Sequence, residues 1–179
     1  MKSGLLSREG KIIEKKSYSM TDTFKVLLAC MKDFHQMFKE EYELDGVAIS
    51  FCGLIDVENA VIDAVWALPF LQGIPWREVI QKELGLHCEI ENDVNCAALS
   101  EVYFGKAQDI KDMAFFVIGT GVGGAISQRD DFVEQLMGEY NKIREKIGMD
   151  VIIPNLKCCT YRQDANLLGA LANYIGRNK

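Results

Sequence analysis

Residues 90–101 read IENDVNCAALSE, and this stretch decides how the chain folds. A brief strand at Cys88–Glu91 is followed by Asn92, and the apolar spacing then predicts a helix over Asp93–Phe104 that ends at Gly105. Open α/β sheets bind ligands where their strands end, at the carboxyl edge. Asp93 there is either the helix N-cap or a carboxylate that takes a proton from a substrate hydroxyl. The Asn92 amide, with a donor and an acceptor, suits a pair of sugar hydroxyls.

A second motif, GTGVGG, covers residues 119–124 and directly follows the predicted strand Met113–Ile118. Glycines let the backbone approach an anion closely, so the motif predicts a loop whose N–H groups bind phosphate. A tight turn between strands and a dinucleotide site stay open as alternatives. The dinucleotide site needs an acidic residue after the next strand, but Val151–Ile153 is followed by Pro154 and Asn155.

The rest of the chain alternates helix and strand patterns, which indicates an α/β fold with helices on the faces of a sheet. The N-terminal residues predict a hairpin that turns at Gly10. Ser19 or Thr21 is the expected cap of the first helix. Further elements are expected at these ranges: strands at 46–51 and 151–153, and helices at 21–42, 75–84, 131–147 and 165–175.

Composition excludes several classes of protein. The chain has 179 residues, 49% of them hydrophobic, which argues against disorder. No apolar run approaches the ~20 residues of a membrane span, and no secretory signal is apparent. The net charge of −6 argues against nucleic-acid binding, and the lysine clusters at 11–16 and 142–146 contain acids, as solvated faces do. We therefore expect a cytoplasmic protein without membrane or nucleic-acid partners.

Six cysteines and two tryptophans need assignment. Without an export signal the cysteines are expected to be reduced thiols, and the absence of a C-x2-C pair disfavours a zinc site built from them. Trp66 and Trp76 are expected to be packing residues and not sugar-stacking platforms.

The two motifs together, residues 90–101 and VIGTGVGGAI at 117–126, resemble the ROK family of repressors and sugar kinases. Two further segments resemble the same family: Gly46–Ser50 with Gly53 and Asp56, and the closing helix with Asp164–Ala170. The resemblance covers nearly the whole chain and is strongest to glucokinases and β-glucoside kinases. It implies an actin-like ATPase (ribonuclease H-like) fold with two lobes.

The resemblance also implies an activity, the ATP-dependent phosphorylation of a hexose or hexose derivative. Asp93 would be the general base, while Asn92, Glu91 and Gly53 would bind the sugar. The nucleotide phosphates, accompanied by Mg²⁺, would lie against Gly119, Thr120, Gly121, Gly123 and Gly124. The family also suggests a homodimer and a bound Zn²⁺, although the zinc ligands are missing from this sequence and no metal site is visible.

Departures from the family pattern affect the expected lobes. The family's first strand and its Asp-Ile-Gly-Gly-Thr loop are missing before about Ser3, and its zinc segment is missing near Ile126–Ser127. Cys52 replaces a common proline, and Ala67 replaces a frequent asparagine, which affects one sugar contact. We expect a small lobe of residues 1–112 plus 164–179 and an incomplete second lobe of residues 113–163.

Two explanations for these departures stay open, a longer kinase of which these residues are part and a true deletion. Two other functions stay open as well: a sugar-sensing transcriptional regulator of the same family, and a non-catalytic sugar-binding remnant.

Overall fold

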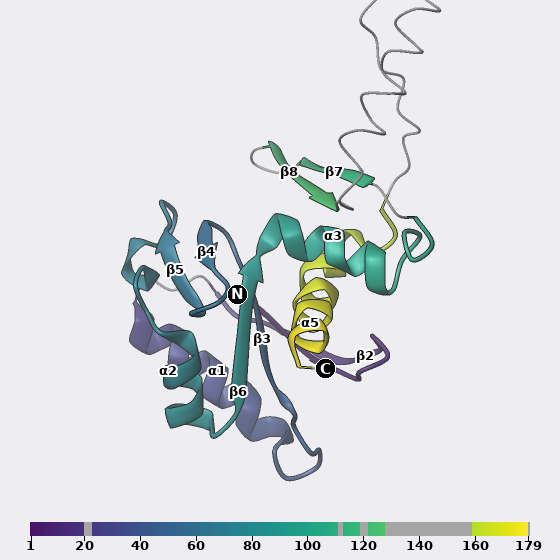
Figure 1. The fold of residues 1–179 in the computed structure, drawn as a ribbon. Helices are drawn as coiled ribbons and strands as arrows, with labels where there is room; N and C mark the ends of the chain where they lie inside the picture. Colours follow the sequence, from purple (N-terminus) through teal and green to yellow (C-terminus); the bar gives the residue numbers. More distant parts are fainter. Residues whose placement is uncertain (20–22, 111–112, 119–121, 128–158, 179) are drawn as a thin grey trace, which may run out of the picture.

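The computed structural model describes residues 1–19, 23–110, 113–118, 122–127 and 159–178. Two parallel strands, β3 (Gly46–Phe51) and β6 (His87–Asn92), run through its centre in Figure 1, paired from Gly46↔His87 to Phe51↔Asn92. Helices α1 (Phe24–Phe38) and α2 (Trp76–Leu84) lie on one side of this pair, and α5 (Ala165–Arg177) lies on the other. The predicted α/β layering is therefore confirmed.

The hydrophobic core lies between the central strands and helices α1 and α2. Cys88 and Ile90 of β6 are fully buried there, because alternate residues of a strand face the same side. Trp76, the first residue of α2, is 1% exposed and meets Phe24 edge-on at 6.0 Å between ring centroids. The prediction that this tryptophan packs in the core is thus confirmed.

The other strands form three antiparallel hairpins. They pair β1 (Lys2–Leu6) with β2 (Ile12–Ser17), β4 (Leu54–Asp56) with β5 (Val61–Ala64), and β7 (Met113–Ile118) with β8 (Val122–Ser127). The first confirms the predicted N-terminal hairpin. The sequence reading missed β4 and β5, because strands of three and four residues carry too little periodicity to be recognised. A short 3-10 helix, η1 (Pro69–Leu71), follows β5.

Two helix starts differ from the prediction. Helix α1 is capped by Thr23, whose Oγ1 accepts from Val26 N at 3.4 Å, and not by Ser19 or Thr21. Helix α2 begins at Trp76, so Pro75 stands one position before the helix. Proline lacks a backbone N–H, and this loss is tolerated both at the first position of a helix, as predicted, and at the position before it, as observed. The predicted elements at 131–147 and 151–153 lie outside the described residues.

Helix α5 brings the end of the chain against its beginning and middle. It packs along α3 (Asp93–Tyr103), and it also contacts β1, β3 and β6. Gly169 allows the helices to approach closely, since a side chain there would overlap the Cys96 backbone carbonyl. The 3-10 helix η2 (Arg162–Asp164) precedes α5, and Lys15 of β2 pairs with Asp164 at 2.9 Å.

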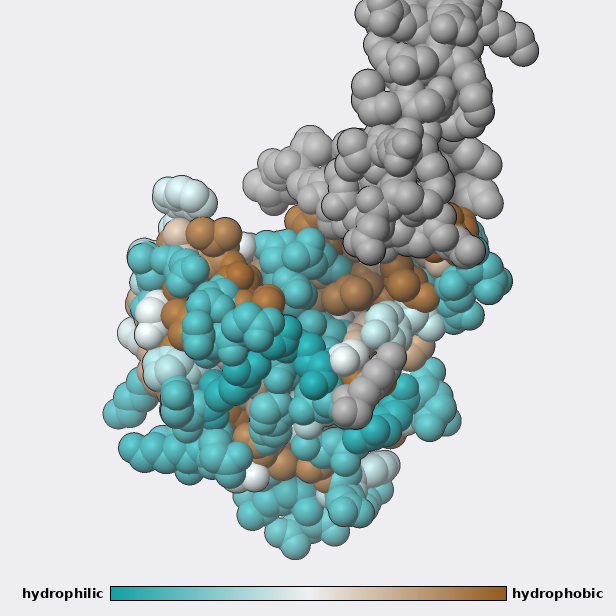
Figure 2. Space-filling model, viewed as in Figure 1, coloured by the Kyte–Doolittle hydropathy of each residue, from teal (hydrophilic) through white to brown (hydrophobic). Residues whose placement is uncertain are grey.

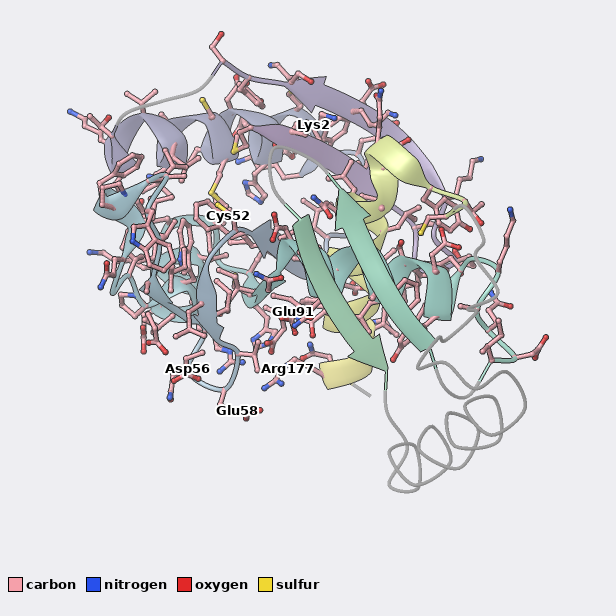
Figure 3. The ribbon with its side chains drawn as sticks, turned by 90° about the horizontal axis from the view of Figure 1, so that it is seen from above. Lys2, Cys52, Asp56, Glu58, Glu91 and Arg177 are labelled. Atoms are coloured by element: carbon pink, nitrogen blue, oxygen red, sulfur yellow. The ribbon has the colours of Figure 1, made fainter. Side chains whose placement is uncertain are left out.

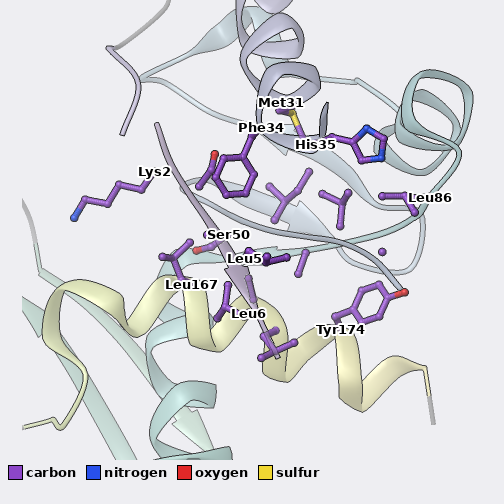
Figure 4. A pocket seen from close by; sticks show the side chains of 18 of the residues that line it. Lys2, Leu5, Leu6, Met31, Phe34, His35, Ser50, Leu86, Leu167 and Tyr174 are labelled. Carbon is purple, nitrogen blue, oxygen red and sulfur yellow. The ribbon is translucent and has the colours of Figure 1, made fainter. Parts of the chain in front are cut away.

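A cavity of about 780 Å³ lies between the hairpin β1–β2 and the strand β3 (Figure 4). Two opposite walls of the cavity are apolar, one with Met31 and Phe34 from α1 and the other with Leu167 from α5. Strand β1 is not hydrogen-bonded to β3 across it, so the described strands form four separate two-stranded sheets. The salt bridge from Arg8 Nε to Asp45 at 2.7 Å joins the end of β1 to the start of β3.

None of the described helices has the length and apolarity that crossing a bilayer requires.

Candidate active site at the carboxyl edge of β3 and β6

The carboxyl ends of β3 and β6 form the candidate site. Because the strands are parallel and end in register at Phe51 and Asn92, the turn after β3 and the start of α3 lie at the same edge. Figure 3 views this edge from above, with Cys52 of the turn and Glu91 of β6 labelled. The sequence analysis placed its candidate residues at this edge, and the structure brings Gly53, Glu91, Asn92 and Asp93 together there.

Asn92 connects the two strand ends. Its Oδ1 caps α3 by accepting hydrogen bonds from Val94 N at 2.8 Å and Asn95 N at 3.3 Å. Its Nδ2 donates to the Gly53 carbonyl oxygen at 2.9 Å. Asn92 is the cap because its backbone is still extended, with φ −63° and ψ 144°. The reading of Asp93 as N-cap is therefore wrong by one residue.

Asp93 is the first residue of α3 and is half-buried. Its Oδ1 accepts from Val94 N at 3.0 Å, and none of the described residues hydrogen-bonds to Oδ2. A negative charge at a helix N-terminus is favoured by the helix dipole. Asp93 is thus held in place through one oxygen, while its other oxygen makes no hydrogen bond within the described residues.

Glu91 supports the same junction from the strand. Its Oε1 accepts from its neighbour Asn92 N at 2.7 Å and from Asn95 Nδ2 at 3.0 Å. The bond to Asn95 fixes Glu91 against the first turn of α3. As with Asp93, the described hydrogen bonds of Glu91 use one carboxylate oxygen.

Gly53 has a backbone conformation that other residues rarely adopt, with φ +121°. A side chain at this position would also overlap the Ala64 carbonyl oxygen on β5. The turn after β3 can therefore pass tightly beneath the β4–β5 hairpin only with glycine. Its carbonyl oxygen is the one that receives the Asn92 amide.

Two cysteines lie next to these carboxylates and are not activated. Burial, with the charge of Asp93 as the next cause, raises the pKa of the Cys52 thiol. Burial also raises the pKa of Cys96, on α3, to about 12. A thiol attacks only as the thiolate, so neither cysteine can act as a nucleophile near neutral pH.

A buried ion-pair cluster on β6 lies two residues before the site and was not foreseen from the sequence. Glu89 is 4% exposed, and it accepts from Arg77 Nη2 at 2.8 Å, Arg177 Nε at 3.0 Å and His87 Nε2 at 2.8 Å. Arg177 also reaches Glu58 at 3.1 Å, and these two side chains lie together in Figure 3. The partners lie 12 and 88 residues away along the chain, so no local pattern could indicate the cluster. It fixes α2 and α5 to β6.

The glycine motif is partly outside the described residues, which exclude Gly119, Thr120 and Gly121. Gly123 and Gly124 lie in β8, where they pair with Val117 and Phe116 of β7. The expectation of one loop over 119–124 is therefore wrong for these two glycines, because the hairpin pairing begins at Val122. The hairpin packs against α3, with β8 contacting the helix that Asp93 begins.

A resident metal site is not apparent in the described part of the chain. No group of three or more His, Cys, Asp or Glu side chains there is placed to hold an ion. The carboxylates of Glu91 and Asp93 are instead engaged with the start of α3.

Comparison with known proteins gives a consistent result. The profile of the ROK family matches residues 1–140. A β-glucoside kinase of Listeria monocytogenes is 34% identical over 134 residues, which are 74% of this chain and 45% of that enzyme. The chain thus spans about half the length of the curated relatives it matches.

Solved structures agree. A ROK family glucokinase from Streptomyces griseus, in complex with glucose and AMPPNP, matches 69% of this chain and 39% of its own, with 25% identity and a TM-score of 0.61. A ROK family protein from Streptococcus pneumoniae, in complex with sucrose, matches 99% and 94% at 21% identity and a TM-score of 0.77. The actin-like ATPase fold predicted from the sequence is confirmed by these similarities.

Proposed function

The chain belongs to the ROK family, and from this premise we propose that it phosphorylates a hexose or hexose derivative with ATP. The observation that carries the proposal is the arrangement of Asp93 beside a glycine turn: Oδ1 is fixed by Val94 N, and Oδ2 has no hydrogen-bond partner among the described residues. The names of the similar kinases support the same class of reaction.

In the proposed reaction Asp93 is the general base. The Oδ2 atom of Asp93 takes the proton from a sugar hydroxyl. The hydroxyl oxygen bonds to the γ-phosphorus of ATP, and the bond from this phosphorus to the bridging oxygen of the departing ADP breaks. Phosphoryl transfer needs positioning and charge stabilisation more than covalent help from the protein. The N-terminus of α3 favours a negative charge close to it, and Asp93 is the first residue of that helix.

The sugar is proposed to bind against Asn92, Glu91 and Gly53. The Nδ2 of Asn92 carries two hydrogens and donates one to Gly53, so one is left for a ligand. The Oδ1 of Asn92 already caps α3 with two bonds. Glu91 has its second carboxylate oxygen available. The site would thus offer one donor and two acceptors at Asn92, Glu91 and Asp93, a set suited to neighbouring hydroxyls.

The phosphates of ATP are proposed to lie against Gly119, Thr120, Gly121, Gly123 and Gly124. Mg²⁺ would neutralise phosphate charge. The described residues lack a metal-binding cluster, so we expect the ion to bind with the nucleotide, and we assign no step to it. The lobe of residues 1–112 with 164–179 is proposed to carry the sugar, which agrees with the packing of α5 on α3 and β6.

The test is a coupled ADP-release assay of the 179-residue chain with glucose, N-acetylglucosamine and β-glucosides. We expect Asp93→Asn to lower the turnover rate by about 10²–10⁴-fold, as loss of a general base does, while sugar affinity by calorimetry changes little. An unchanged turnover rate would contradict the role of Asp93. Sugar binding without turnover in the unaltered chain would favour the non-catalytic alternative.

A further inference from the structure

Two apolar features of the described residues are not used by the candidate site. One lies on the surface, where Trp66 is 90% exposed and Leu54 is 63% exposed, and Figure 2 shows hydrophobic residues gathered over β4 and β5. The expectation that Trp66 is a packing residue is therefore wrong, whereas the same expectation holds for Trp76. The other feature is the cavity of about 780 Å³ between β1 and β3, and this one is bordered by two strand edges.

The cavity is lined by the edges of β1 and β3 and not by their faces. Every residue of β1 from Lys2 to Leu6 and every residue of β3 from Gly46 to Phe51 lines it. A strand that turned one face to the cavity would line it with alternate residues only. Among the described strands, β1 is hydrogen-bonded to β2 and β3 to β6, so each has one edge without a partner strand. Two rows of main-chain N–H and C=O groups therefore border the cavity.

The gap between these two edges has room for one more strand. With few exceptions, the Cα atoms of β1 lie more than 8 Å from those of β3. Neighbouring strands of a sheet lie about 4.8 Å apart, so two strands with a third between them lie about 10 Å apart. Arg8, after β1, pairs with Asp45, before β3, so the two strands run in opposite directions. A segment between them would pair with one in parallel and with the other in antiparallel fashion, and both pairings are regular.

The helices on both sides of the gap select an apolar segment. One side is covered by α1, with Met31 and Phe34, and the other by α5, with Leu167 (Figure 4). Successive side chains of a strand point to opposite faces, so every side chain of an inserted segment would meet one of these two helices. Strands covered on both faces are continuous apolar runs, and we expect the same of this segment.

The charged side chains that line the cavity lie at its ends. Lys2 lies at one end, and Arg8, Glu43 and Asp45 lie at the other. Between these ends β1 and β3 present uncharged residues, and α1 adds His35. A charge in the middle of an inserted segment would be buried without a partner, which is unfavourable. The segment that fits is therefore uncharged except at its ends.

We propose that the cavity is a binding slot for an extended, apolar segment of another polypeptide chain, which pairs with β1 on one side and with β3 on the other. Its length follows from these two strands, which have 5 and 6 residues. Insertion would join the two-stranded sheets β1–β2 and β3–β6 into a single sheet, and a two-stranded sheet is marginal on its own. Main-chain hydrogen bonds would supply affinity, and the apolar faces would supply selectivity. The inference does not depend on the proposed kinase activity.

The test adds a synthetic peptide, acetyl-Lys-Lys-Val-Ile-Val-Ala-Ile-Val-Lys-Lys-amide, to the 179-residue chain. Hydrogen exchange followed by mass spectrometry reports where the peptide binds. We expect slower exchange of the amides of β1 and β3 when the peptide is present, and no change in the β4–β5 hairpin. Protection of only one of the two strands, or of neither, would overturn the slot. A dimer in light scattering whose β1 and β3 amides are protected before peptide is added would mean that a second copy fills the slot, and would overturn the proposal as well.

Two further measurements separate a paired strand from a ligand that is merely apolar. N-methylation of alternate residues of the peptide removes the donors along one edge, and we expect it to weaken binding in fluorescence anisotropy by more than about tenfold. Leu167→Gln places an amide on the apolar wall and should weaken binding about tenfold. Val26→Gln is the matched control and should not change it, because Val26 of α1 is 49% exposed and does not line the cavity. Undiminished binding of the methylated peptide, or undiminished binding by Leu167→Gln, would refute the proposal.

Discussion

Replacing Asn92 tests how the candidate site is held together. Asn92→Ala removes the cap of α3, which is worth about 1 kcal/mol, and the bond to the Gly53 carbonyl, worth about another 1 kcal/mol. We therefore expect the free energy of unfolding to fall by about 2 kcal/mol. Asn92→Asp keeps the capping oxygen and loses the donor, so its loss should be near half of that, about 1 kcal/mol.

The assay is urea unfolding followed by circular dichroism, with Asn95→Ala as the control. Asn95 is exposed and contributes a bond to Glu91, so its replacement should cost well under 1 kcal/mol. If Asn92→Ala and Asn92→Asp lose the same free energy, the bond to Gly53 carries the whole effect and the capping role is refuted. If Asn92→Ala loses less than about 0.5 kcal/mol, the connection between the strand ends is not a stabilising feature.

The remaining predictions concern the turn, the buried ion pairs and the thiols. Gly53→Ala should destabilise the protein by more than about 2 kcal/mol in urea unfolding, whereas Gly73→Ala, with positive φ but open space around it, should cost about 1 kcal/mol; equal losses would refute the overlap with Ala64. Glu89→Gln should cost about 3 kcal/mol at pH 7, because Arg77 and Arg177 lose their buried partner. Burial raises the pKa of Glu89, but Arg77, His87 and Arg177 outweigh burial and the net shift of this pKa is downward. The stabilisation by ionised Glu89 is therefore present above the ordinary glutamate pKa and is lost as the pH falls through the lowered pKa of the folded state. The free energy of unfolding of Glu89→Gln should accordingly depend less on pH below about pH 4.5 than that of the unaltered protein. Burial raises the pKa of Cys88 and Cys96 to about 12, so both thiols should react with a thiol reagent only at the rate of unfolding, whereas exposed Cys159 should react at once. Mass spectrometry of the labelled peptides measures these rates, and rapid labelling of Cys96 would contradict its burial.

Sequence reasoning located the junction between β6 and α3, where the candidate site is proposed, because the information for it is local. The change from an apolar strand to polar residues and then to helical spacing occurs within residues 88–104, and the structure places strand β6 and helix α3 there. The cap was assigned one residue late because Asn92 and Asp93 are both good capping residues. The backbone angles of Asn92, which are set by its pairing with β3, decide between them.

What sequence reasoning missed depends on contacts between distant segments. Glu89 finds Arg177 at the other end of the chain, and nothing near either residue indicates the pairing. Trp66 and Trp76 follow similar apolar neighbours, yet one is exposed and the other is buried. Their burial is decided by which elements cover them, and that requires the fold.

The position of α5 has a consequence for how this protein is made. Residues 1–110 leave the ribosome well before residues 165–177, and until then one face of β3 and β6 has no helix to cover it. Glu89 would meanwhile lack Arg177, and Gly46 would lack the Tyr174 ring that later packs on it. Until residues 165–177 have been synthesised, the nascent chain therefore presents an incomplete domain with an uncovered sheet face. Slow translation of residues 111–164 would lengthen that exposure, so the yield of folded protein should be sensitive to codon choice in that stretch.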